Sequence, residues 1–210
     1  MLSRMRLPLL AALAAALFTS DASARPKAIG LRDGDLVFQR SHSQQSAAVG
    51  LATRSSLTHM GVVFLDGGEP WVLEAVEPVK RTPFESWRRR GEGGRIWVKR
   101  LRDANAILTP EKVARMRELG QSWLGRHYDL QFRWDDERLY CSELVYKLYE
   151  RGAGVSIGRV QRAGEMALGH PEVQRKMRQR FGDHGFSPDE PVVTPQAMFD
   201  DPRLVLVGGY

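Results

Sequence analysis

The side chain best suited to act as a nucleophile in this chain is Cys141, its only cysteine. Apolar and aromatic residues follow it at helical spacing, and Arg151 and Gly152 come after them as a basic last turn and a stop. The pattern predicts a short buried helix with Cys141 at its start. Helix N-termini stabilise anions, and a thiolate is an anion, so this position favours a reactive thiol. The alternative is an inert cysteine that fills space in the core.

A nucleophilic cysteine needs a general base, and five histidines compete for that role: His42, His59, His127, His170 and His184. His59 differs from the others because it opens a strongly apolar segment and would lie at the rim of the sheet core. His127 lies in the segment before the cysteine helix and is a second candidate. The remaining three lie in polar or glycine-rich segments. We therefore expect His59 to be the base.

A third group, Glu74, is a carboxylate inside the otherwise apolar segment 71–76. A carboxylate is costly to bury unless it is paired. If residues 66–69 form a hairpin loop, Gly61 lies opposite Glu74, and His59 becomes a diagonal neighbour on the same face, about 7 Å away. We expect Gly61 to leave the space between the two side chains open. The alternative is that Glu74 points to solvent from an edge strand.

The elements that must position these groups follow from periodicity and turn signals. Strands are predicted at 35–39, 59–65, 71–76, 79–82, 95–101 and 203–207. Helices are predicted at 43–53, 83–90, 110–124, from Cys141 onward, and over 162–180 with a break near Gly169; residues 91–94, 125–137 and 188–195 are predicted as loops. Neighbouring strands with helices clustered around them indicate an α+β fold with an antiparallel sheet packed on helices.

The N-terminal segment has the features of a secretory signal peptide. Two arginines precede a short apolar run, Leu7–Phe18, and a small-residue cleavage site, Ala22–Ala24. We expect residues 1–24 to be removed and residues 25–210 to form one periplasmic or secreted domain without a membrane-spanning segment. The alternative is an uncleaved N-terminal anchor.

Composition narrows the classes of function. The formal net charge of +6 suits a protein beside an anionic envelope, and no recognition motif accompanies it, so we do not expect nucleic-acid binding. One cysteine cannot form an internal disulfide, and a lone thiol in an oxidising compartment indicates either intermolecular pairing or a reactive group. One cysteine and scattered histidines do not make a zinc site of usual spacing, so we expect neither metal nor cofactor.

Five segments carry a resemblance to a known family: Asp33–Phe38, Thr58–Val63, Leu73–Val76, Tyr128–Asp129 and Tyr140–Val145. In order and spacing they resemble the circularly permuted papain-like amidases of the YiiX/YaeF/YebB group, within the NlpC superfamily. The resemblance covers nearly all of the chain after the signal peptide. It implies a permuted papain-like fold, in which the histidine precedes the cysteine.

The resemblance also implies roles for the residues. Cys141 would be the nucleophile, His59 the base and Glu74 the group that orients the base. Tyr128 and Tyr140 match aromatic positions of the family and would line the site or pack in the core. The implied reaction is hydrolysis of an amide through a thioester, with the amide N–H of Cys141 helping to stabilise the oxyanion.

Three functions fit this sequence. The leading one is a periplasmic cysteine hydrolase acting on amide bonds, with peptidoglycan-derived peptides or other acyl amides as substrates. The second is a lipid-directed acyl hydrolase or acyltransferase on the same fold. The third is a non-catalytic module that binds the cell envelope. The sequence does not indicate the oligomeric state.

Overall fold

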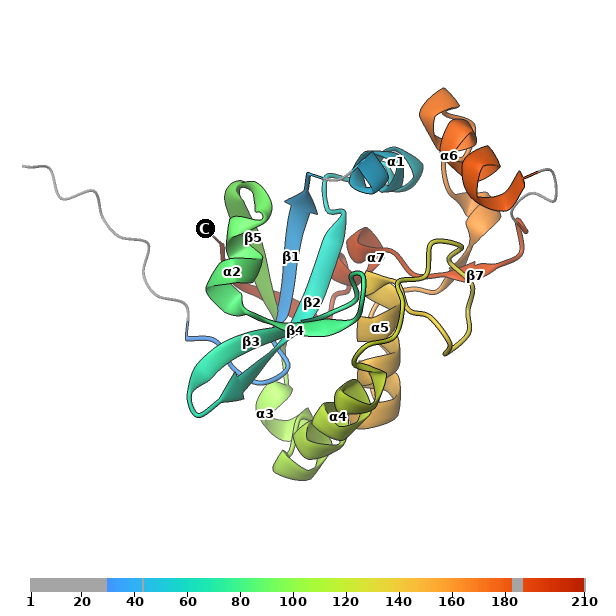
Figure 1. Ribbon diagram of the computed structural model, residues 1–210. Coiled ribbons are helices and arrows are strands. Elements are labelled where there is room, and N and C mark those ends of the chain that lie inside the picture. Colours follow the sequence, from blue (N-terminus) through green and yellow to red (C-terminus); the bar gives the residue numbers. More distant parts are fainter. Residues whose placement is uncertain (1–29, 43, 183–186, 210) are drawn as a thin grey trace, which may run out of the picture.

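A six-stranded antiparallel sheet forms the centre of the molecule, in the order β4-β3-β2-β1-β5-β8 (Figure 1). The computed structural model describes residues 30–42, 44–182 and 187–209; the predicted signal peptide lies outside these residues. The strands of this sheet are β1 (Leu36–Ser41), β2 (His59–Asp66), β3 (Glu69–Glu74), β4 (Lys80–Pro83), β5 (Gly91–Leu101) and β8 (Leu204–Gly209). A second, two-stranded sheet pairs β6 (Gln161–Arg162) with β7 (Pro191–Val192). The predicted antiparallel α+β fold is confirmed.

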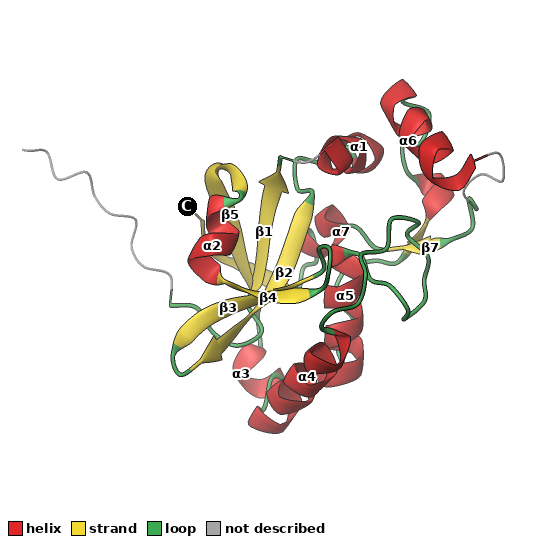
Figure 2. Cartoon of the chain, in the orientation of Figure 1, coloured by secondary structure: helices red, strands yellow, loops and turns green. Residues whose placement is uncertain are grey.

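Helices surround the sheet (Figure 2). They are α1 (Gln44–Thr53), α2 (Phe84–Arg89), α3 (Ala104–Ile107), α4 (Pro110–Trp123), α5 (Cys141–Leu148), α6 (Pro171–Phe181) and α7 (Pro195–Phe199), with a π-helical turn at Tyr149–Ala153 and a 3-10 turn at Ala163–Glu165. Thr109 caps α4, because its hydroxyl accepts from the Lys112 N–H at 3.4 Å.

The two faces of the sheet carry separate apolar clusters, because side chains alternate along each strand. On β2, Met60, Val62 and Phe64 belong to the larger cluster, which also contains the buried side of α5. Val63 belongs to the smaller cluster, which α2 covers with Phe84 and Trp87. Figure 1 shows α4 and α5 away from α2, and α6 projecting near α1. His59 has the same parity as Val63, so it faces α2.

Several predicted boundaries are wrong. The helix predicted over 162–180 begins only at Pro171, and the residues before it form strand β6 and a 3-10 turn. Strand β5 begins at Gly91, not at 95, because the segment that we expected to be a loop continues the pairing with Ser41 across a bulge. The cysteine helix does not end at Gly152: a π-helical turn carries it to Ala153, and Gly154 ends it with a φ of 72°. The predicted loop 188–195 contains strand β7 and the first residue of α7.

A buried ion cluster ties the loop before α5 to that helix. The Lys147 ammonium donates to Glu143 at 2.7 Å, to Asp136 at 2.8 Å and to the carbonyl of Asp135. It also lies over the ring of Trp134, 5.1 Å from its centre. Glu143 and Lys147 are both buried; burial raises the pKa of Glu143 to about 8, and the hydrogen bond and charge of Lys147 oppose this rise.

Among the described residues, no helix is both long enough and apolar enough to cross a membrane.

Candidate active site

The β2–β3 hairpin has the predicted register. Phe64 pairs with Trp71 and Leu65 with Pro70. Asp66 also pairs with Glu69, so the loop contains only Gly67 and Gly68 and not the four residues expected. Gly67 and Gly68 make the turn, with φ values of 59° and 91° that glycine adopts without strain.

Gly61 has a different role from the one expected of it. A Cβ at this position would lie 2.5 Å from Cγ1 of Val72 and 2.7 Å from the carbonyl oxygen of Leu73. The space beside Gly61 is therefore filled by strand β3, not open as we expected. Glycine lets the two strands approach closely, and this brings Glu74 toward His59.

His59 and Glu74 form a buried hydrogen-bonded pair. Nε2 of His59 lies 2.7 Å from Oε2 of Glu74, and the carboxylate is fully buried. The other carboxylate oxygen, Oε1, accepts from the Thr82 hydroxyl at 2.6 Å and from the guanidinium of Arg90. The ring of Trp87 stacks against His59 with 5.9 Å between ring centres. This network satisfies a carboxylate that would otherwise be costly to bury.

These contacts shift the pKa values of both partners. Burial alone would lower the pKa of His59, but hydrogen bonding to Cys141 and then to Glu74, together with their charges, raises it to about 9. Burial raises the pKa of Glu74, but the hydrogen bond and charge of His59, with Thr82 and Arg90, lower it to about 2. The pair is therefore an imidazolium and a carboxylate at neutral pH.

Cys141 is the first residue of α5, as predicted, with Tyr140 at the N-cap position. Its side chain is buried. Helix α5 packs against β2, and the side chain of Cys141 hydrogen-bonds to that of His59, the first residue of the strand. Because Nε2 of His59 is engaged by Glu74, Nδ1 is the nitrogen left for the thiol. The structure thus brings together Cys141, His59 and Glu74.

The other histidines have different surroundings. His127, the second candidate, is exposed, and its Nδ1 lies 2.6 Å from a carboxylate oxygen of Glu77. His170 caps α6 by accepting from the Glu172 N–H at 3.2 Å. His42 is exposed, and His184 lies outside the described residues.

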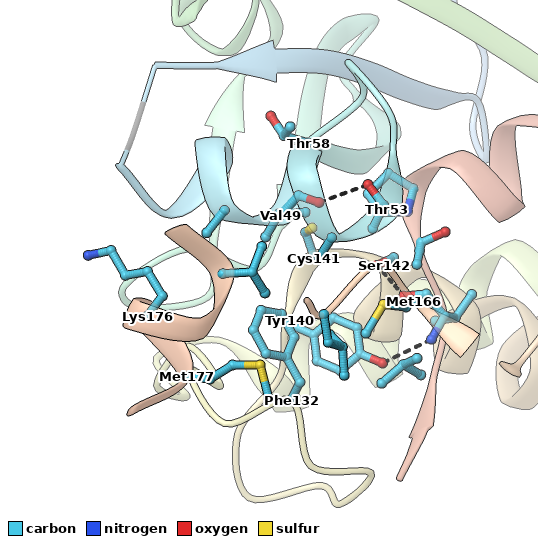
Figure 3. Close-up of a pocket in the computed structure, with 18 of the residues that line it drawn as sticks. Val49, Thr53, Thr58, Phe132, Tyr140, Cys141, Ser142, Met166, Lys176 and Met177 are labelled. Atoms are coloured by element: carbon cyan, nitrogen blue, oxygen red, sulfur yellow. Dashed lines mark hydrogen bonds between the residues drawn. The ribbon is translucent and has the colours of Figure 1, made fainter. Parts of the chain in front are cut away.

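An apolar pocket opens beside Cys141 (Figure 3). It holds about 770 Å³ of empty space, its mouth included. Its walls come from α1, the loop before α5, α6 and the segment 192–195, and they include Val49, Phe132, Met166, Met177, Phe181 and Val193. Figure 3 shows Tyr140 and Phe132 below the thiol and Val49 beside it. A pocket with this lining is suited to an aliphatic or aromatic group.

The structure places both predicted tyrosines, Tyr128 and Tyr140, in the lining of this pocket. Tyr140 is buried, accepts from the Val193 N–H at 3.2 Å, and packs edge-on against Phe132 with 5.1 Å between ring centres. Burial raises its pKa well above the ordinary value, so it stays a neutral phenol. Tyr140 thus shapes the wall nearest to Cys141.

Comparisons with known proteins show the family to which the chain is similar. The family whose sequence profile matches residues 30–208 is described as a permuted papain-like amidase enzyme, YaeF/YiiX, C92 family. The chain is 40% identical to the uncharacterized protein YiiX of Escherichia coli (strain K12) over 174 residues, which are 83% of this chain and 84% of the relative. A crystal structure described as metalloprotein YiiX from Escherichia coli O157:H7 matches with a TM-score of 0.80 at 39% identity, over 86% of this chain and 98% of the other.

The description of that structure names a metalloprotein. Over residues 30–42, 44–182 and 187–209, the present structure contains no group of three or more His, Cys, Asp and Glu side chains arranged to hold a metal ion.

Proposed function

The chain belongs to the YaeF/YiiX family of permuted papain-like amidases, and from that membership we propose that it is a cysteine hydrolase whose catalytic residues are Cys141, His59 and Glu74. The observation that carries the proposal is the buried pair of His59 and Glu74, 2.7 Å apart, beside Cys141 at the start of its helix. A base held by a buried acid next to a thiol is the arrangement that nucleophilic catalysis needs.

In this mechanism His59 already holds the proton of Cys141 as an imidazolium, and the thiolate attacks the carbonyl carbon of the scissile bond. The N–H of Cys141 is the first of α5 and has no acceptor within the helix, so it is available to bind the oxyanion. His59 then gives its proton to the leaving amine, and the acyl group remains on sulfur as a thioester. Water, deprotonated by His59, releases the acid and restores the thiol.

The lining of the pocket supports one of the substrate classes expected from the sequence more than the others. Peptidoglycan peptides carry several carboxylates and amino groups, whereas the walls beside Cys141 are mainly aliphatic and aromatic. The lining favours the lipid-directed alternative: an amide, or an ester, one side of which carries a long apolar group. Tyr128 and Tyr140 would contact that group.

Hydrolysis of an N-acyl amino acid series tests this proposal. The protein of residues 25–210 should cleave long-chain members faster than the acetyl member, because only the long chain fills the pocket. Cys141→Ala and His59→Ala should each lose nearly all activity, and the double variant should lose little more. Peptidoglycan fragments assayed in parallel test the first substrate class. Full activity in Cys141→Ala would end the hydrolase proposal.

Each assay should be run with a chelator and with added Zn²⁺, since a relative is described as a metalloprotein. We expect equal rates in both, because the proposed mechanism uses only side chains and water. A chelator-sensitive rate would require a metal step.

We also propose that the protein is exported and that residues 1–24 are removed, which rests on the Ala22–Ala24 site. The intact mass of protein isolated from the periplasm tests this. A mass that includes the N-terminal arginines would refute it.

A further inference from the structure

Helix α6 places two basic side chains, Lys176 and Arg180, in the wall of the apolar pocket, and Lys176 donates to the side-chain oxygen of Gln179 at 3.3 Å. The side of α6 that lines the pocket carries Val173, Met177 and Phe181, three apolar residues at helical spacing. Arg180 lies among them and is half-buried. Charged side chains are seldom buried without a partner, so a half-buried guanidinium in a mainly apolar wall calls for an explanation.

The surroundings of Arg180 supply only part of what a guanidinium needs. Its charged group lies over the ring of Phe132, 5.7 Å from the centre. Within the described part of the chain, it forms no ion pair and no hydrogen bond. Burial is the main cause that lowers the pKa of Arg180, although the charges of Tyr128 and Asp129 oppose it.

The nearest acid cannot serve as its partner. Asp129 is buried, and its two carboxylate oxygens accept from the backbone N–H groups of Gln131 and Arg133. These bonds fix the loop that carries Phe132. Within residues 30–42, 44–182 and 187–209, the guanidinium of Arg180 thus has no carboxylate partner, and its N–H groups can donate to a group that enters the pocket.

The position of Arg180 relates it to the nucleophile. Phe132, on which Arg180 stacks, packs against Tyr140, and Tyr140 directly precedes Cys141. A ligand that reaches the thiol along this wall must pass the guanidinium. A guanidinium presents paired N–H donors that match the two oxygens of a carboxylate or a phosphate.

We propose that Arg180 determines substrate specificity by binding an anionic oxygen group, a carboxylate or a phosphate, on an amphiphile whose apolar chain fills the pocket. This inference rests on the proposed function, because it names the substrate class of the same site. It adds a charge requirement that the apolar lining alone does not impose.

Binding of matched ligands to the Cys141→Ala protein tests the inference without turnover. Decanoate and its neutral isostere decanamide, both below micellar concentration, are titrated by calorimetry. We expect decanoate to bind at least about tenfold more tightly, as hydrogen bonds to a charged group allow. Decyl phosphate distinguishes a phosphate from a carboxylate preference, and acetate and inorganic phosphate show whether the anion binds without its chain.

Arg180→Met should abolish the preference for decanoate and leave decanamide binding unchanged, since methionine keeps the apolar stem. Arg178→Met, on an exposed part of the same helix, is the control and should keep the preference. Arg180→Lys, which keeps the charge but loses the fork, should recover part of it. Thermal melts check that each variant is folded.

Equal affinity for decanoate and decanamide in the parent protein, or an unchanged preference in Arg180→Met, would overturn the role of Arg180. Those results would leave the hydrolase proposal standing, because that depends on activity lost in Cys141→Ala. Failure of every decyl ligand to bind would overturn both the role of Arg180 and the apolar substrate class.

Discussion

The two carboxylate oxygens of Glu74 bind different partners. Oε2 serves His59, and Oε1 is held by Thr82 and Arg90. All three donors come from different elements, so the carboxylate is fixed from three directions. A fixed carboxylate fixes the ring of His59, because the Nε2 bond sets both its rotation and its tautomer.

Replacing Glu74 by glutamine should therefore cost more than one hydrogen bond. If the amide oxygen accepts from His59, the amide N–H₂ faces the donors Thr82 and Arg90. We expect kcat/KM to fall about 10- to 100-fold, as for other residues that orient a functional histidine. Glu77→Gln, which alters the exposed pair with His127, is the control and should retain its rate. An unchanged rate in Glu74→Gln would remove Glu74 from the mechanism.

The charge state of His59 sets an upper pH limit for activity. Its pKa is raised to about 9, so the imidazolium that stabilises the thiolate is present below that pH and lost above it. We expect kcat/KM to decline on the alkaline side with an apparent pKa of about 9. A pH–rate profile between pH 5 and 10 measures this. A decline centred near 6.5 would contradict the hydrogen bonding described for His59.

Arg90 tunes the same limit through Glu74. It is 41% exposed in its side chain, so its effect is partly screened by water. Arg90→Met should make Glu74 more basic and move the alkaline limit upward by about half a pH unit. Arg89→Met, one residue earlier and exposed, should leave the profile unchanged. A matching shift in both variants would point to overall charge instead.

The sequence predicted the role of Glu74 but not those of Thr82 and Arg90, which donate hydrogen bonds to it. His59 and Glu74 could be paired from hairpin register alone, because the turn fixes which residues face each other. Thr82 lies two strands from His59, and its position requires knowing that β4 pairs with β3. Arg90 is one of three consecutive arginines, and the sequence does not distinguish the one that turns toward the sheet.

Among the secondary-structure elements, the β2–β3 pair decides whether the site forms. Gly61 permits an approach that any side chain would prevent, since both Val72 and the backbone of Leu73 lie under 3 Å from its position. The register was predictable, but the closeness was not, because it depends on how the strands twist and pack.

Gly61→Ala should separate the two strands and disturb the His59–Glu74 pair. We expect a loss of about 1–3 kcal/mol in the free energy of unfolding, typical of overpacking, and a large loss of activity. Gly169→Ala is the control, because a Cβ there meets nothing within 4 Å. Urea unfolding followed by circular dichroism measures the stability. Equal stability of the two variants would contradict the close approach.

The ion cluster on α5 fixes the loop that carries Tyr128 and Phe132. Lys147→Met should leave Glu143 buried without its cation and lower the free energy of unfolding by about 3 kcal/mol. Adding Glu143→Gln should restore part of that loss. Lys80→Met, on an exposed edge strand, should have little effect. If the double variant is no more stable than Lys147→Met, the pair is not the cause.

For the molecule as a whole, several carboxylates make stability depend on acid. The pKa values of Glu74, Asp136 and Asp201 are all about 2, below the ordinary values of 4.5 and 3.8. Glu74 is held low by His59 against the effect of burial, Asp136 chiefly by Arg151, and Asp201 by Arg203 against the effect of burial. The unfolded chain therefore binds more protons than the folded one between about pH 4.5 and 2.

The free energy of unfolding should thus be fully supported by these groups above about pH 4.5 and fall as the pH drops toward 2. Urea unfolding at pH 5, 4, 3 and 2.5 measures it. Asp201→Asn should be less stable at pH 5 and show a shallower decline. A stability that stays constant down to pH 2.5 would contradict these ion pairs.

The overall fold followed from the sequence more fully than its details did. Strand periodicity and the turn residues Gly67 and Gly68 are local signals, and they indicated the antiparallel sheet. The π-helical turn after α5 and the pairing of Gly91 with Ser41 depend on contacts between distant segments, such as the close packing of Gly152 on Met116. Local patterns do not encode such contacts.

Because the start of α5 lies beside the start of β2, the reactivity of the Cys141 thiol also reports on folding. Before the sheet assembles, Cys141 has neither an imidazolium beside it nor a completed helix behind it, and it behaves as an ordinary thiol. A chain that crosses a membrane unfolded would therefore carry a thiol that is not activated. Its thiol would react slowly with oxidants and electrophiles until α5 packs against β2. Because each chain has one cysteine, the amount of thiol that a reagent labels rapidly measures the fraction of molecules in which Cys141 is activated.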